Sequence, residues 1–169
     1  MLPRILPVED REISDLAHKA FEKQGMNIMT SATVGALQKG KNKVTATIQK
    51  NGNTTELTFD RIILAVGIVG NVENLGLENT KVKVDSTHIA IDQWGATAEP
   101  GVYAIGDVAG PPWLAHKASH EGITCVKKIA GQPTVHPLEV SRIPSCTYCR
   151  PQIASVGLTE AAAKEKGYL

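Results

Sequence analysis

The chain has 169 residues, of which 42% are hydrophobic and 21% charged, and its net charge is +1. This composition is typical of a globular protein, and the small net charge provides no basic surface for nucleic acid or for an anionic membrane. The longest apolar stretch, residues 62–69, is far too short to span a bilayer. Three cysteines and no readable signal peptide argue against a secreted disulfide framework, so we expect a reducing compartment, the cytoplasm or an organelle matrix.

The first part of the sequence predicts a helix followed by an antiparallel sheet. Apolar residues recur at helical spacing over residues 9–24, with Asp10 as a plausible N-cap and Gly25 as a plausible stop. Strand-like segments follow at residues 27–36, 43–50 and 54–66. The Asn-Gly pair at residues 51–52 predicts a tight hairpin between the last two. We expect the third strand to end in a buried apolar run, residues 62–67.

The second part of the sequence alternates strands and helices. Residues 87–91 and 102–105 are strand-like, and the second of these segments is expected to be a buried parallel strand. A second helix is predicted over residues 115–130, with a stop at Gly131. A proline-containing loop, a last strand and a last helix then follow, at residues 132–144, at residues 152–158 and from Thr159.

Residues 96–110 predict a turn, a short strand and an aspartate at the end of that strand. The turn is supplied by Glu99-Pro100-Gly101. Gly106 lacks a Cβ, so another backbone or a ligand can come close to it. Asp107 then lies at the carboxyl end of the strand, where open α/β sheets bind their ligands. Its carboxylate only accepts hydrogen bonds, which suits a sugar hydroxyl.

This run resembles the second FAD-binding motif of the pyridine nucleotide-disulfide oxidoreductases. The matching residues are Thr97, Tyr103, Ala104, Ile105, Gly106 and Asp107. The resemblance implies that Gly106 and Asp107 bind FAD, with the Asp107 carboxylate on the ribityl chain.

A second segment, residues 61–77, resembles the part of this family that crosses from the NAD domain to the FAD domain. Ala65, Gly67 and Asn71 match its pattern, whereas Ile68 stands where many relatives carry arginine. The resemblance implies that Gly67 and Val34 bind NAD. The departure at Ile68 leaves open how the cofactor is held at that point.

Residues 110–122 lead into the second predicted helix. The free N–H groups of its first turn would favour an electron-rich ligand edge, such as the pyrimidine edge of a reduced flavin. The residues expected at this edge are Trp113, Leu114, Ala115 and His116. The segment resembles the dihydrolipoyl dehydrogenase branch of the family through Leu114, Ala115, His116, Lys117, Ala118, Glu121 and Gly122.

Histidines and cysteines offer an alternative, a non-enzymatic metal-binding module. His116 and His120 are one helical turn apart, and Cys146-x-x-Cys149 is half of a zinc motif. We favour ordinary side chains, because a zinc site needs four ligands and no second pair of ligands is evident. A dithiol redox centre should open a helix, whereas Pro151 and a predicted strand follow these cysteines. His136 precedes a proline but does not match the family's catalytic base.

The sequence contains no G-x-G-x-x-G, and by resemblance it also lacks the family's redox disulfide and catalytic base. We therefore expect a fragment of a longer chain that is inactive by itself, with no catalytic residue and no metal site of its own. The expected fold class is α/β, from partial doubly wound domains with an antiparallel meander, becoming α+β at the end. The expected parts are the end of an NAD domain, the second half of an FAD domain and the start of an interface domain, at residues 1–68, 69–140 and 141–169.

The function implied by the resemblance is oxidation of dihydrolipoamide to lipoamide, with electrons passing through FAD to NAD⁺. The implied partners are a second copy of the chain in the intact enzyme and the lipoyl domain of 2-oxoacid dehydrogenase or glycine cleavage complexes. A relative of mercuric or glutathione reductase is the nearest alternative. The implied compartment is the bacterial cytoplasm or a mitochondrial matrix.

Overall fold

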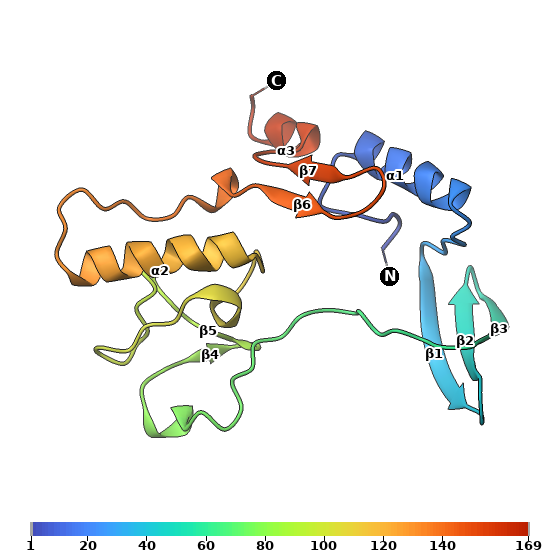
Figure 1. Cartoon of the computed structure of the whole chain (residues 1–169), viewed down its shortest axis with the longest axis horizontal. Helices are drawn as coiled ribbons and strands as arrows, with labels where there is room; N and C mark the ends of the chain where they lie inside the picture. The colour runs from blue at the N-terminus through green and yellow to red at the C-terminus, as the bar shows by residue number, and fades with distance from the viewer. Residues whose placement is uncertain (1, 169) are drawn as a thin grey trace. The chain divides into compact units, whose positions relative to one another are not determined.

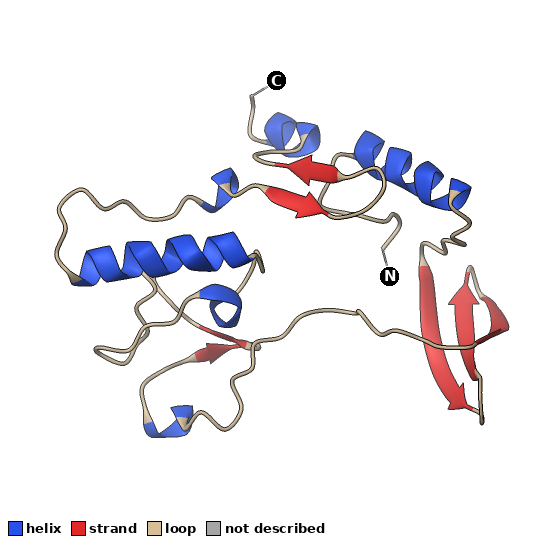
Figure 2. Ribbon diagram, in the orientation of Figure 1, coloured by secondary structure: helices blue, strands red, loops and turns tan. Residues whose placement is uncertain are grey.

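The computed structural model describes residues 2–168 and divides into two compact units. Unit 1 comprises Met1–Ala65 with Cys146–Leu169, and unit 2 comprises Val66–Ser145. Figure 1 labels the elements of both units, and Figure 2 shows that loops join the short elements of unit 2. Among the described residues, no helix has the length and apolar character needed to cross a membrane.

Unit 1 contains a three-stranded antiparallel sheet. Its strands are β1 (Ala32–Lys39), β2 (Val44–Lys50) and β3 (Asn53–Phe59), in the order β1-β2-β3. At the β2–β3 tip, Asn51 and Gly52 have φ values of 51° and 78°. Two positive φ values are what a two-residue type I′ hairpin requires, so the predicted hairpin is confirmed. The first strand begins later than predicted, at Ala32.

The remaining elements of unit 1 are α1, a two-stranded sheet and α3. Their bounds are α1 (Arg11–Lys23), β6 (Ser145–Thr147), β7 (Ile153–Ser155) and α3 (Glu160–Glu165). The predicted stop at Gly25 is confirmed by its φ of +91°. The predicted N-cap at Thr159 is also confirmed, because its hydroxyl accepts the N–H of Ala162 at 3.2 Å.

Asp10 differs in part from its prediction. It precedes α1 as expected, but its carboxylate makes no capping hydrogen bond to that helix. Instead its Oδ1 accepts the backbone N–H of Glu160 at 2.8 Å. Close by, the Ser155 hydroxyl donates to Glu9 Oε1 at 3.2 Å. The start of α1 is thus bonded to residues 155–160 rather than capped internally.

The buried strand end expected at residues 62–67 is wrong. β3 ends at Phe59, and the following residues form no strand. Ile63 and Val66 are each 90% exposed. A strand is buried only where it belongs to a sheet whose face is covered, and no described strand pairs with this run. The apolar pattern alone therefore did not suffice to predict a buried strand, because burial also requires neighbouring strands.

Unit 2 is built around α2. Its elements are η1 (Leu77–Asn79), β4 (Val84–Asp85), β5 (His88–Ile89), η2 (Gly106–Ala109), α2 (Ala115–Ile129) and η3 (Val140–Arg142). The strands β4 and β5 form a short antiparallel hairpin, and η2 packs against both β5 and α2. α2 ends at Ile129, Gly131 follows with φ 69°, and the chain then returns beside the helix (Figure 1). The α2 helix and its stop are confirmed as predicted.

The buried parallel strand expected at residues 102–105 is also wrong. Tyr103 makes one isolated antiparallel bridge, to Ala96, and is 41% exposed. The preceding turn is present, since the Val102 N–H donates to the Glu99 carbonyl at 3.1 Å and Gly101 has φ +81°. The turn thus folds the segment back on residue 96, and no described strand lies beside it to form a parallel sheet.

Candidate functional site

Asp107 lies in η2 with its side chain exposed. The residue before it, Gly106, is buried and has φ +76°, and a Cβ added there would lie 3.2 Å from the Cβ of Ala118 on α2. Glycine therefore allows both the bend and the close approach of η2 to α2. Among the described residues no hydrogen bond or ion pair engages the Asp107 carboxylate. Its oxygens are thus available to accept from a hydroxyl.

Two side chains of α2 hold the loop of residues 106–110 in place. Lys117 is 3% exposed, and its Nζ donates to the carbonyls of Gly106 at 3.3 Å and Gly110 at 2.8 Å. The same Nζ lies 3.0 Å from Glu121 Oε1, while Glu121 Oε2 accepts the Gly106 N–H at 2.7 Å. All three ammonium donors are therefore used. This ion pair of buried Lys117 and half-buried Glu121 fixes both ends of residues 106–110 against α2.

The N-terminal turn of α2 is uncapped by any side chain. Leu114 occupies the N-cap position without a side-chain hydrogen bond, so the first N–H groups of the helix lack an intrahelical acceptor. These N–H groups and the helix dipole favour an electron-rich ligand. Trp113 is half-buried, whereas Ala115 and His116 are exposed. His116 Nε2 donates to the Pro144 carbonyl at 2.8 Å, so this nitrogen carries a proton.

The structure thus brings together the residues predicted to bind FAD. Gly106 and Asp107 are on η2, which packs on α2, and residues 114–116 form the start of α2. An exposed carboxylate and an uncapped helix start fit a ligand that carries hydroxyls and an electron-rich ring edge.

The two residues predicted to bind NAD lie in different units. Val34 is on β1 in unit 1, where it pairs with Ile48 next to a β-bulge and is 50% exposed. Gly67 begins an irregular stretch of unit 2 and has φ +155°. A Cβ added to Gly67 would meet no atom within 4 Å, so space alone does not require glycine there.

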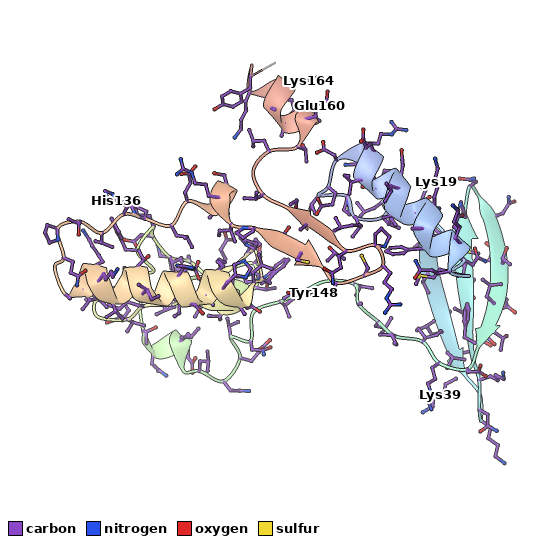
Figure 3. All side chains as sticks on the ribbon, turned by 45° about the horizontal axis from the view of Figure 1, so that its top comes forward. Lys19, Lys39, His136, Tyr148, Glu160 and Lys164 are labelled. Atoms are coloured by element: carbon purple, nitrogen blue, oxygen red, sulfur yellow. The ribbon has the colours of Figure 1, made fainter. Side chains whose placement is uncertain are left out.

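The histidines and cysteines do not assemble into a metal site within residues 2–168. No three His, Cys, Asp or Glu side chains there are close enough together to hold a metal ion. The Cys149 thiol instead donates to the carbonyls of Thr147 at 3.3 Å and Pro151 at 3.0 Å. Figure 3 places His136 on the loop that follows α2. Nothing in this arrangement supports the metal-binding alternative.

Cys125 on α2 is buried, and its titration gives a prediction. Burial, and secondarily the Asp92 carboxylate, raises the pKa of the Cys125 thiol. Above the ordinary thiol pKa of about 8.5, the unfolded chain loses this proton while the folded chain keeps it, so the contribution of Cys125 to stability falls as the pH rises. Raising the pH from about 8 to about 10 should lower the free energy of unfolding more in the wild-type chain than in Cys125→Ala.

Urea titrations of both proteins at the two pH values measure this difference. A thiol reagent supplies an independent check, because only the thiolate reacts. Cys146 and Cys149 are half-buried and should be modified before Cys125. Equal pH slopes in the two proteins, together with labelling of Cys125 at the rate of the other thiols, would contradict this account.

Lys117, Glu121 and His88 have roles in the site that sequence reasoning did not assign. Lys117 and Glu121 were recognised only as part of a sequence match, although their i,i+4 spacing on a predicted helix is a signal for an ion pair. His88 gave no sequence signal, yet its Nε2 accepts the Trp113 indole N–H at 3.2 Å. That contact joins segments 25 positions apart and depends on tertiary structure.

Comparison with known proteins gives consistent matches along the chain. Residues 1–122 match the family described as pyridine nucleotide-disulphide oxidoreductase, and residues 143–169 match the dimerisation domain of that family. The chain is 55% identical over 168 residues to a dihydrolipoyl dehydrogenase of Rhizobium etli, covering 99% of this chain and 35% of that protein. It is 49% identical to a dihydrolipoyl dehydrogenase of Zymomonas mobilis, covering 98% of this chain and 36% of that protein. The chain thus spans about a third of the length of these curated relatives.

Two solved structures share the fold. The flavoprotein disulfide reductase RclA from Escherichia coli, in a Cu(II) complex, superposes with a TM-score of 0.86 at 23% identity, covering 98% of this chain and 37% of that chain. LpdA from Mycobacterium tuberculosis superposes with a TM-score of 0.85 at 24% identity, covering 98% of this chain and 35% of that chain. These neighbours confirm the mixed α/β fold class. Because the family match covers residues 1–122, the chain belongs to the pyridine nucleotide-disulphide oxidoreductases.

Proposed function

We propose that this chain forms part of the flavin and NAD sites of an enzyme that oxidises dihydrolipoamide to lipoamide, with electrons passing through FAD to NAD⁺. The structural observation that carries the proposal is the loop at residues 106–110. The Lys117–Glu121 pair fixes this loop, while the Asp107 carboxylate remains exposed and, among the described residues, unpaired. The similarity to proteins named dihydrolipoyl dehydrogenase supports the choice of substrate.

In this proposal the chain binds and orients the cofactor. The Asp107 carboxylate accepts hydrogen bonds from ribityl hydroxyls, which are strong because the acceptor is charged. The α2 N–H groups lie at the electron-rich edge of the flavin ring, with Trp113, Leu114, Ala115 and His116 around it. FAD, when bound, supplies the electron-transfer chemistry. Gly67 and Val34 are proposed to contact NAD.

We also propose an assembly and a compartment for the intact enzyme. The match of residues 143–169 to a dimerisation domain supports a homodimer in the intact enzyme. The proposed partner is the lipoyl domain of a 2-oxoacid dehydrogenase or glycine cleavage complex, which would present the dihydrolipoyl group. The bacterial relatives favour the cytoplasm as the compartment.

A chimera tests the proposed activity. This chain would replace the matching 168 residues of the Rhizobium etli relative, to which it is 55% identical. We expect the chimera to bind FAD and to form NADH from NAD⁺ with dihydrolipoamide, and to be much less active with glutathione or mercuric ion as alternative substrates. The 169-residue chain alone is expected to show no turnover.

The controls separate folding from function. The intact relative provides the reference activity, and circular dichroism establishes that the chimera is folded. A folded chimera without FAD, or one that preferred glutathione disulfide or mercuric ion over lipoamide, would overturn the proposed function.

A further inference from the structure

The indole ring of Trp113 is held by a histidine on the β4–β5 hairpin. Trp113 Nε1 donates to His88 Nε2 at 3.2 Å, and the two ring centroids lie 5.8 Å apart at an interplanar angle of 31°. Both side chains are half-buried. This contact fixes the orientation of the ring immediately before α2, where the flavin edge is proposed to lie.

The hydrogen bonds determine the protonation state of His88. Because an indole N–H can only donate, Nε2 of His88 must carry a lone pair. His88 Nδ1 lies 3.1 Å from Thr87 Oγ1, so in the neutral ring Nδ1 carries the proton and donates to that hydroxyl. A second proton on Nε2 would face the indole N–H and abolish the contact. Trp113 is therefore held only while His88 is neutral.

The same hairpin also contacts two other parts of the proposed site. A Cβ added to Gly70 would lie 2.4 Å from the Thr87 carbonyl oxygen, so the stretch that follows Gly67 passes directly against residue 87. Strand β5 packs against η2, which carries Asp107. Residues 87–89 thus lie against the stretch after Gly67, the Asp107 loop and the Trp113 ring.

We propose that neutral His88 is a positioning residue, which fixes the Trp113 indole beside the first turn of α2 and so sets the affinity of this site for flavin. The inference rests on the proposed function. The charged groups on the elements packed against β5 are Asp85, the cross-strand partner of His88 on β4, and Asp107 on η2. Neither makes a hydrogen bond or ion pair with His88 among the described contacts.

Nuclear magnetic resonance on the ¹⁵N-labelled 169-residue chain tests the contact without any cofactor. The chain has two tryptophans, so Trp94→Phe identifies the Trp113 indole signal. In the wild-type chain this N–H should exchange with water about two- to ten-fold more slowly than in His88→Leu.

His88→Gln is the matched variant, because its amide oxygen can accept the indole N–H. It should keep the slow exchange, while the Trp94 signal stays unchanged in the His88 variants. Equal exchange in wild-type and His88→Leu, or exchange in His88→Gln as fast as in His88→Leu, would overturn the proposal.

Flavin affinity is the second measurement, made in the chimera described above. His88→Leu should weaken FAD binding about two- to ten-fold, and His88→Gln should restore it. A chimera that binds FAD equally well with leucine at this position would overturn the role of His88. A wild-type chimera that binds no FAD would instead overturn the proposed function, while the magnetic resonance result still decides whether His88 holds Trp113.

Discussion

Lys117→Met is expected to lower the free energy of unfolding by about 3–5 kcal/mol, because it leaves the Glu121 carboxylate, which is only 17% exposed, without its partner. The variant also removes the donors to the Gly106 and Gly110 carbonyls. This loss is a large part of the total stability of an ordinary domain, about 5–15 kcal/mol. Both tryptophans lie in unit 2, so tryptophan fluorescence during urea unfolding reports on the unit that contains the substitution.

The control for this variant is Lys127→Met, on the same helix but exposed. It should change the free energy of unfolding by no more than about 0.5 kcal/mol. The double variant Lys117→Met with Glu121→Leu removes both charges and should recover part of the loss. If Lys117→Met and Lys127→Met were equally stable, the Lys117–Glu121 pair would not hold residues 106–110 in place.

Asp107→Ala is expected to weaken FAD binding by the chimera about 10- to 100-fold. Hydrogen bonds to a charged group contribute about 1.5–3 kcal/mol each, and the variant would remove at least one. Asp107→Asn keeps an uncharged acceptor and should lie between the wild type and Asp107→Ala. Flavin fluorescence titration of the three proteins measures these affinities.

Glu73→Ala is the matched control, because it removes another exposed carboxylate from unit 2. Its FAD affinity should equal that of the wild type. A loss of affinity equal to that of Asp107→Ala would show that net charge, rather than a contact at Asp107, governs binding.

Sequence reasoning predicted the locally determined parts of the fold. The helices α1 and α2 follow from apolar spacing and from glycines with positive φ after each helix, Gly25 and Gly131. The β2–β3 hairpin follows from the Asn51-Gly52 pair. These features depend on residues close in sequence, so the sequence pattern was sufficient to predict them.

The failures concern strands whose burial depends on distant neighbours. Residues 62–67 and 102–105 have the apolar pattern of buried strands, the first expected at the end of an antiparallel sheet and the second in a parallel one. A strand is defined by its partners. Among the described residues no strand pairs with residues 62–67, and residues 102–105 make only one isolated antiparallel bridge. A short apolar pattern therefore does not establish burial without knowledge of the sheet.

The site was predicted in part. A short motif indicated Asp107, because its residue types and spacing carry chemical meaning. The groups that hold it were not assigned, since the contacts of Lys117 with the Gly106 and Gly110 carbonyls require the packing of η2 on α2. The contact between His88 and Trp113 likewise joins elements whose proximity depends on the tertiary fold.

A crystal structure of the chimera with bound FAD tests the central claim most directly. The account predicts that the Asp107 carboxylate accepts a hydrogen bond from a ribityl hydroxyl, with the first turn of α2 directed at the pyrimidine edge of the flavin and the Lys117–Glu121 contacts unchanged. FAD bound with Asp107 facing solvent, beyond hydrogen-bonding distance of the ribityl chain, would contradict it.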